Sequence, residues 1–222
     1  PYTALDLLTT SSITEAYHFA EKLNKYNKIR QEKEDGILNE ALAKIGSSEK
    51  YKDMKALLIA GESWHQGVIG IVASRLSKVY NKAVIVFSIN GDQTLGSCRS
   101  ITGLNIIEAL TECSHVLDRF GGHPMAAGLA LKTSNLEEFF STFESVICRK
   151  LKEGSQYPML DIDGEIELSE LDDEFYEVLG NLEPFGHSNQ QPHFLMNRLT
   201  PVKVNPVANN HTRGMLKDAK NN

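Results

Sequence analysis

The stretch RFGGHPMAAG, residues 119–128, surrounds a single histidine with glycines and other small residues. Glycine is used where the backbone needs unusual φ and ψ values or where another group must approach it closely. One interpretation is a tight turn packed under a core. The other is a polar ligand resting on the N–H groups of Gly121 and Gly122 while His123 donates a hydrogen bond. Because a lone histidine is commonly a structural group, the residues alone leave both interpretations open.

A second candidate for anion binding is GSCRS, residues 96–100. Strand alternation would place Ser97 and Arg99 on one face and Cys98 and Ser100 on the other. A hydroxyl beside a guanidinium suits a phosphate, because arginine offers two donors matched to two oxygens. The alternative is an edge strand whose polar residues face water.

A third candidate is ESWHQGVIGIVASR, residues 62–75, which is typical of a strand, a short loop and a helix. Backbone N–H groups at such a helix start commonly bind phosphate or carboxylate. His65 lies in the loop and Arg75 in the helix. The alternative is an ordinary turn, with Trp64 as packing and Arg75 in solvent.

The same residues argue against several other chemistries. His65, His115 and His123 are scattered, and no spacing typical of metal ligands or of a nucleophilic serine is present. We therefore expect no metal site in this chain. The net charge of −6 makes nucleic-acid binding dependent on locally clustered positive charge. Taken alone, these patterns predict an anion-binding α/β domain without its own catalytic machinery.

The elements that would position these residues follow from periodicity. We expect a long helix over residues 12–45, either continuous or bent at Gly36. Apolar runs at 56–60 and 83–89 flank a helix and predict a β-α-β unit. The further expected elements are a strand at 94–100, a short helix at 106–110, a glycine-histidine loop, a strand at 128–132 and a helix at 136–151. The fold class is therefore α/β with a mixed sheet, followed by a small β-rich module from about Tyr157.

Four segments together resemble one known family. WHQGVIGIVASRL, GSCRS, RFGGHPMAAGLAL and LEPFGHSNQQPHF occur here in the order in which they occur in the RecJ exonuclease family of the DHH/DHHA1 phosphoesterase superfamily. The resemblance implies a connecting helix region at 1–50, a DHHA1 domain at 51–154 and the start of an OB-fold domain at 155–222. It also implies that the metal-bearing DHH domain is missing, that the OB-fold is incomplete, and that the chain is a fragment. Mn²⁺ or Mg²⁺ is expected on the missing DHH domain.

The resemblance assigns roles to the glycine-histidine and serine-arginine motifs. His123 would be the catalytic group, binding substrate phosphate near the scissile bond together with Gly121 and Gly122. Ser97 and Arg99 would clamp the 5′ end.

Further contacts are implied outside these two motifs. Arg75 would touch another phosphate, with His65 and Ser100 as additional candidates. In the OB-like segment, stacking and charge would come from Phe185, Phe194, Lys203 and Arg213, although either aromatic ring would also suit a core.

The function so implied is the substrate-binding portion of a metal-dependent 5′→3′ single-stranded DNA exonuclease of DNA repair and recombination. The alternatives are a phosphodiesterase of short oligonucleotides or cyclic dinucleotides, and a non-catalytic nucleic-acid-binding module. Single-stranded DNA is the expected partner, and a single-strand-binding protein is a further candidate. Three cysteines without a paired spacing and the lack of an apolar span favour a cytoplasmic protein that does not enter a membrane. We expect it to be a monomer.

Overall fold

A computed structural model describes residues 2–151, 160–186, 188–207 and 211–218. The chain divides into two compact units, residues 1–158 and residues 159–222. Each unit is described by itself.

The described part of the first unit consists of helices and strands around one sheet. In chain order its elements are α1 (Tyr2–Thr9), α2 (Ile13–Gly46), α3 (Lys50–Asp53), β1 (Ala56–Glu62), α4 (Gln66–Tyr80), β2 (Ala83–Asn90), β3 (Gln93–Arg99), α5 (Ile106–Glu112), β4 (Arg119–His123), β5 (Ala126–Lys132) and α6 (Leu136–Lys150).

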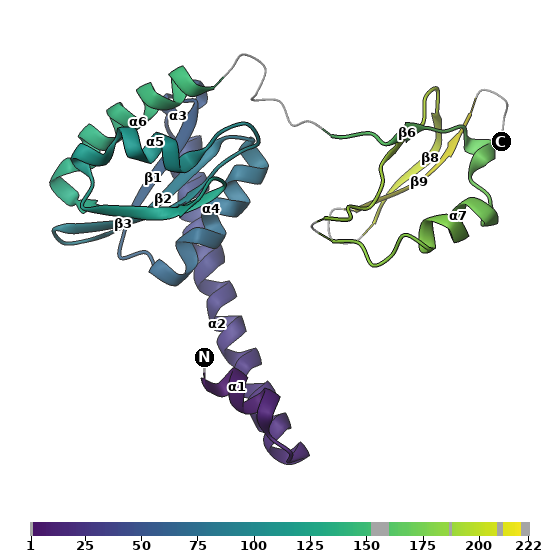
Figure 1. The fold of residues 1–222 in the computed structure, drawn as a ribbon, viewed down its shortest axis with the longest axis horizontal. Helices are drawn as coiled ribbons and strands as arrows, with labels where there is room; N and C mark the ends of the chain where they lie inside the picture. The colour runs from purple at the N-terminus through teal and green to yellow at the C-terminus, as the bar shows by residue number, and fades with distance from the viewer. Residues whose placement is uncertain (1, 152–159, 187, 208–210, 219–222) are drawn as a thin grey trace. The chain divides into compact units, whose positions relative to one another are not determined.

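The sheet has the strand order β1-β2-β3-β5-β4, with β4 at one edge. β1 and β2 are parallel and joined through α4, as predicted for a β-α-β unit, and the remaining neighbours are antiparallel. The sheet is therefore mixed, which confirms the predicted fold class (Figure 1).

Side chains of the central strands point alternately to the two faces of the sheet and pack into two hydrophobic cores, one on each face. Phe87 packs against Phe139 and Phe140 of α6 on one face. Leu57 and Val86 pack with α4 and the end of α2 on the other. In β1 and β2, the residues that point to either face of the sheet are apolar. Both strands are therefore buried on both faces, as is typical of strands between two helical layers.

Of the two alternatives for the long helix, the continuous one is formed, since α2 runs from Ile13 to Gly46 without interruption. The Ser12 side chain caps its start by accepting a hydrogen bond from the Glu15 N–H. Only its second half reaches the core, through Ile37 and Ala41. The polar first half extends away from the sheet, with α1 beside it (Figure 1).

The glycine-histidine segment is a strand and not the predicted loop. β4 pairs with β5 from Arg119 to His123, and the turn lies at residues 124–125. Gly122 has φ of +147°, and a Cβ there would lie 2.4 Å from the Ala126 carbonyl oxygen. The small residues therefore allow two strands to approach closely, which a loop interpretation did not anticipate.

The second unit contains shorter elements. They are β6 (Gly164–Glu165), α7 (Asp173–Gly180), β7 (Phe194–Leu195), β8 (Thr200–Val207) and β9 (His211–Lys217). β6 pairs with β7, and β8 pairs with β9 as an antiparallel hairpin. The Phe194 ring packs on Phe175, with centroids 5.3 Å apart, so this aromatic residue serves local packing.

Candidate phosphate-binding site

The pairing of β3, β5 and β4 brings the two predicted motifs onto one face of the sheet. Ser97 is paired with Gly128, which is paired with Gly121. Residues paired directly across a sheet point to the same side, so these three positions form a row.

A second row lies beside the first. Arg99 is paired with Ala126, which is paired with His123. Neighbouring strands are about 4.8 Å apart, so Arg99 and His123 are about 10 Å apart at the backbone. Only Ala126 stands between them. Ser97, Arg99 and His123 therefore lie on one face of the sheet, within two strand spacings of one another.

This face is open over β5 and β4. Helix α4 packs on β2 and β3. Gly128, Gly121 and His123 are exposed, although Ala130 in the neighbouring row is buried. A glycine at two of the three positions of the first row leaves backbone within reach of a ligand.

A groove of about 410 Å³ occupies this face. Its lining residues are Gln66, Ile69, Leu95, Gly96, Ser97, Arg119, Phe120, Gly121, Gly128 and Leu129. The lining includes one arginine and no acidic residue. This composition suits an anion that carries an apolar part.

Arg99 is held in place by two hydrogen bonds. Its Nε donates to Ser74 Oγ at 2.7 Å, and its Nη1 donates to the Cys98 carbonyl at 2.7 Å. The Ser74 hydroxyl in turn donates to the Gly70 carbonyl at 3.0 Å. Nη2 lies 3.2 Å from where a Cβ of Gly70 would be. The guanidinium is therefore half-buried and preorganised, because a glycine gives it room beneath α4.

Two candidate residues have structural roles instead. Ser100 is buried on the opposite side of β3, and its hydroxyl donates to the Leu104 carbonyl at 2.6 Å. His65 precedes α4 as its N-cap, with Nδ1 accepting from the Gly67 N–H at 3.1 Å. Ser100 thus stabilises a turn, and His65 caps a helix while remaining exposed.

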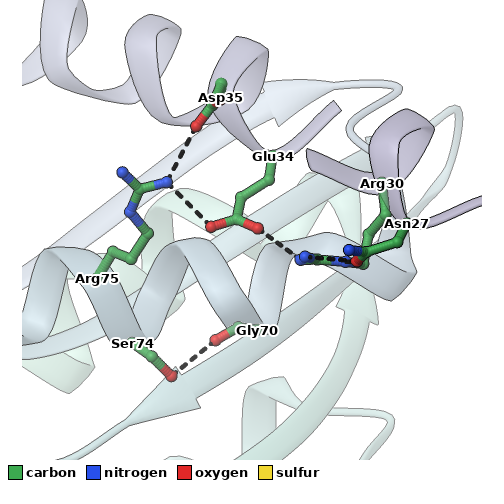
Figure 2. Close-up of polar contacts among 7 residues, drawn as sticks. All are labelled: Asn27, Arg30, Glu34, Asp35, Gly70, Ser74 and Arg75. Carbon is green, nitrogen blue, oxygen red and sulfur yellow. Dashed lines mark hydrogen bonds and ion pairs between the residues drawn. The ribbon is translucent and has the colours of Figure 1, made fainter. Parts of the chain in front are cut away.

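Arg75 faces α2 and not the sheet. Its Nη1 bonds to the carboxylates of Glu34 and Asp35, each at 3.0 Å (Figure 2). These hydrogen bonds raise the pKa of the Arg75 guanidinium above its usual value. Glu34, whose side chain is 10 % exposed, also accepts from Arg30 at 2.6 Å. Arg75 therefore fastens the long helix to α4, in a place where the sequence suggested a phosphate contact or a solvated arginine.

Three residues near the groove were missed from the sequence. Arg119 shares the groove face of β4 with Gly121, and Gln66 begins α4 on the opposite wall. Ser74 orients Arg99. The alternation of Arg119, Gly121 and His123 was readable in the sequence, but only if the segment had been interpreted as a strand.

The negative charge of the chain lies away from this groove. Residues 159–222 contain eleven acidic and five basic residues, whereas residues 1–158 contain eighteen of each. The net charge of −6 is thus entirely in the second unit, and it does not oppose anion binding by the first.

The residues that the structure describes include neither a metal-ligand cluster nor a membrane-spanning helix. Within the described ranges, no group of three His, Cys, Asp or Glu side chains is arranged to hold a metal ion. No helix in the described part of the chain is long and apolar enough to cross a bilayer.

Two segments of the chain match models of known protein families. The family model for the DHHA1 domain matches residues 53–148, and the model for the RecJ OB domain matches residues 162–222. Residues 53–148 therefore match a DHHA1 domain, and residues 162–222 match a RecJ OB domain. Both rows and the whole groove lie within the DHHA1 domain.

Similar proteins are exonucleases by name. The single-stranded-DNA-specific exonuclease RecJ of Bacillus subtilis is 32% identical over 211 residues, covering 94% of this chain and 27% of the relative. The protein of that name from Escherichia coli is 34% identical over 195 residues, covering 85% of this chain and 34% of the relative. The chain therefore spans about a third of the length of these relatives, matching their C-terminal part.

The fold is shared with solved structures. RecJ of Thermus thermophilus in complex with Mg²⁺ has a TM-score of 0.80 and 26% identity, covering 97% of this chain and 33% of that one. The complex with Mn²⁺ has a TM-score of 0.81.

Proposed function

We propose that this chain is the substrate-binding part of a metal-dependent 5′→3′ single-stranded DNA exonuclease acting in DNA repair and recombination. The observation that carries the proposal is the row formed by Arg99, Ala126 and His123, beside the row of Ser97, Gly128 and Gly121. It combines hydrogen-bond donors, a small floor and an open approach. The substrate class, single-stranded DNA, is taken from the names of the relatives.

In this proposal the terminal phosphate of the strand lies over Gly128. Ser97 donates its hydroxyl proton from one side. Arg99 donates from Nη2, the guanidinium nitrogen that bonds to neither Ser74 nor the Cys98 carbonyl. His123 donates from β4 to the phosphate next to the scissile bond. Preorganised donors of this kind stabilise the charge that develops during hydrolysis.

The metal ions are assigned to another part of the protein. RecJ of Thermus thermophilus has been solved in complex with Mg²⁺ and in complex with Mn²⁺. Divalent ions of this kind activate water and neutralise phosphate charge. With either ion added, we expect the 222-residue chain alone to release no nucleotides from single-stranded DNA.

The second unit offers a surface for nucleotides further along the strand. On the β8–β9 hairpin, Lys203, Asn205 and Arg213 share one face, since Asn205 is paired with Arg213. All residues of both strands are exposed. An exposed basic face suits backbone phosphates.

The proposal extends to a cytoplasmic location. Its support is that Cys98, Cys113 and Cys148 are all free thiols, which a reducing compartment maintains. Recruitment by a single-strand-binding protein is part of the same proposal.

The test is binding of single-stranded DNA of about ten nucleotides, a length typical of one such module, with a 5′ phosphate or a 5′ hydroxyl. We expect tighter binding of the phosphorylated strand, weakened about 10-fold by His123→Ala and by Arg99→Ala. His115→Ala and Arg149→Ala are matched controls, because His115 lies in the 3-10 helix before β4 and Arg149 of α6 bonds to Glu112, so neither belongs to the two rows. Equal binding by all variants would refute the site.

A further inference from the structure

Arg119 is the residue in the groove that the proposed function leaves without a role. It begins β4, is exposed, and lines the groove. Unlike Arg75 and Arg99, its guanidinium makes no hydrogen bond or ion pair with any residue that the structure describes. An uncommitted cation at the edge of an otherwise uncharged groove retains its full capacity to bind an anion.

The position of Arg119 relative to the first phosphate site follows from strand geometry. Arg119 and Gly121 alternate on the same face, as do Gly121 and His123. Same-face neighbours along a strand are separated by about 6.7 Å, so Arg119 is about 13 Å from His123.

This spacing matches that of an extended nucleic-acid strand. Each nucleotide contributes as many backbone bonds to the chain as two amino-acid residues do. A strand extended along β4 therefore advances by about one nucleotide for every same-face residue, and Arg119 lies about two nucleotides from His123.

The groove between these positions has the chemistry of a nucleotide. Leu95 and Ile69 supply apolar surface, and Gln66 supplies an amide from the α4 wall. Sugar or base atoms contact apolar surface well, whereas the phosphates need donors at each end. Gly121 leaves space, since a Cβ there would meet no atom within 4 Å.

We propose that Arg119 binds an internal phosphate of the same strand, about two nucleotides beyond the phosphate held by His123, so that β4 contacts two phosphates of one strand. This inference rests on the proposed function, because it takes the first phosphate site as given. Arg119 then sets how many nucleotides are needed for full affinity.

The experiment is competition against a labelled single strand by 5′-phosphorylated thymidine mono-, di- and tetranucleotides and by a strand of about ten nucleotides. The variant is Arg119→Gln. The control is Lys78→Gln, which removes the same charge from an exposed position in the last turn of α4.

We expect Arg119→Gln to weaken binding of the tetranucleotide and of the longer strand about 10-fold and to leave binding of the mononucleotide unchanged. For the longer strand, the slope of log K against log[salt] should fall in magnitude by about 0.7, as for one lost phosphate contact. Lys78→Gln should change neither quantity.

Two results would overturn the inference while leaving the proposed function intact. One is an equal loss for mononucleotide and longer strand, which would place Arg119 at the first phosphate. The other is an effect no larger than that of Lys78→Gln. Failure of the wild-type chain to bind any of these ligands would overturn both.

Discussion

Arg99 Nε donates a 2.7 Å hydrogen bond to Ser74 Oγ, which joins the candidate phosphate ligand on β3 to helix α4. The serine hydroxyl proton is already used in the bond to Gly70, so its oxygen is available to accept. Ser74 therefore acts as a positioning residue for Arg99.

Replacing Ser74 by Ala should weaken binding of 5′-phosphorylated single strands by about 3- to 10-fold, because a guanidinium free to change rotamer loses preorganisation. The check is a double-mutant cycle with Arg99→Ala. Ser74→Ala should have no further effect when Arg99 is already absent. An equal effect in both backgrounds would mean that Ser74 acts only on stability.

Gly121 and Gly122 are adjacent, yet they should respond in opposite ways to alanine. Gly122→Ala should lower the free energy of unfolding by about 1–3 kcal/mol, since φ is +147° and the new Cβ would meet the Ala126 carbonyl. Gly121→Ala should leave stability within about 0.5 kcal/mol but weaken phosphate binding, because its methyl group would stand in the groove. Denaturant unfolding and binding assays on both proteins separate the roles. Equal stability of the two variants would contradict the account of β4.

The ion pairs around Glu34 should stabilise the attachment of α2. Glu34→Gln removes a largely buried carboxylate that accepts from Arg30 and Arg75, and it should lower the free energy of unfolding by about 1–2 kcal/mol. Glu32→Gln, at an exposed position on the same helix, is the control, with an expected change below about 0.5 kcal/mol. Similar effects of the two changes would show that the network is energetically unimportant.

Ser97 and Arg99 show most clearly which features of the site could be predicted from the sequence. Their shared face follows from the two-residue period of a strand, which is a local property, and the prediction was confirmed by the pairing with Gly128 and Ala126. Their place beside His123 was not predictable in the same way. It depends on β5 lying between β3 and β4, a choice made by tertiary packing.

Arginine roles were the least accessible to sequence reasoning. Arg75 was assigned to phosphate, but it is 3.0 Å from Glu34, which is 41 positions earlier in the chain. Arg119 was passed over because the glycines after it were interpreted as a loop. In both cases the deciding contacts come from segments that pattern analysis treats separately.

Burial of two thiols should make stability fall at high pH. Desolvation raises the pKa of Cys113 to about 11 and raises that of Cys98 further. In the unfolded chain both thiols ionise near pH 8.5, so above that pH the unfolded state binds fewer protons than the folded state. The free energy of unfolding should therefore decline as pH rises from about 8 to 10.

The check is the denaturant midpoint across this pH range for the wild type and for Cys113→Ala. The variant should show a shallower decline, whatever its stability at neutral pH. An identical slope in the two proteins would exclude Cys113 from the effect.

The most direct test of the central claim is an amide NMR titration of the chain with a 5′-phosphorylated single strand of about ten nucleotides. The account predicts the largest shifts at Ser97, Gly121, Gly122, His123 and Gly128, with little change on the outer face of α6. Shifts confined to residues 160–218, or spread evenly over the sheet, would contradict the assignment of the phosphate site to β3, β5 and β4.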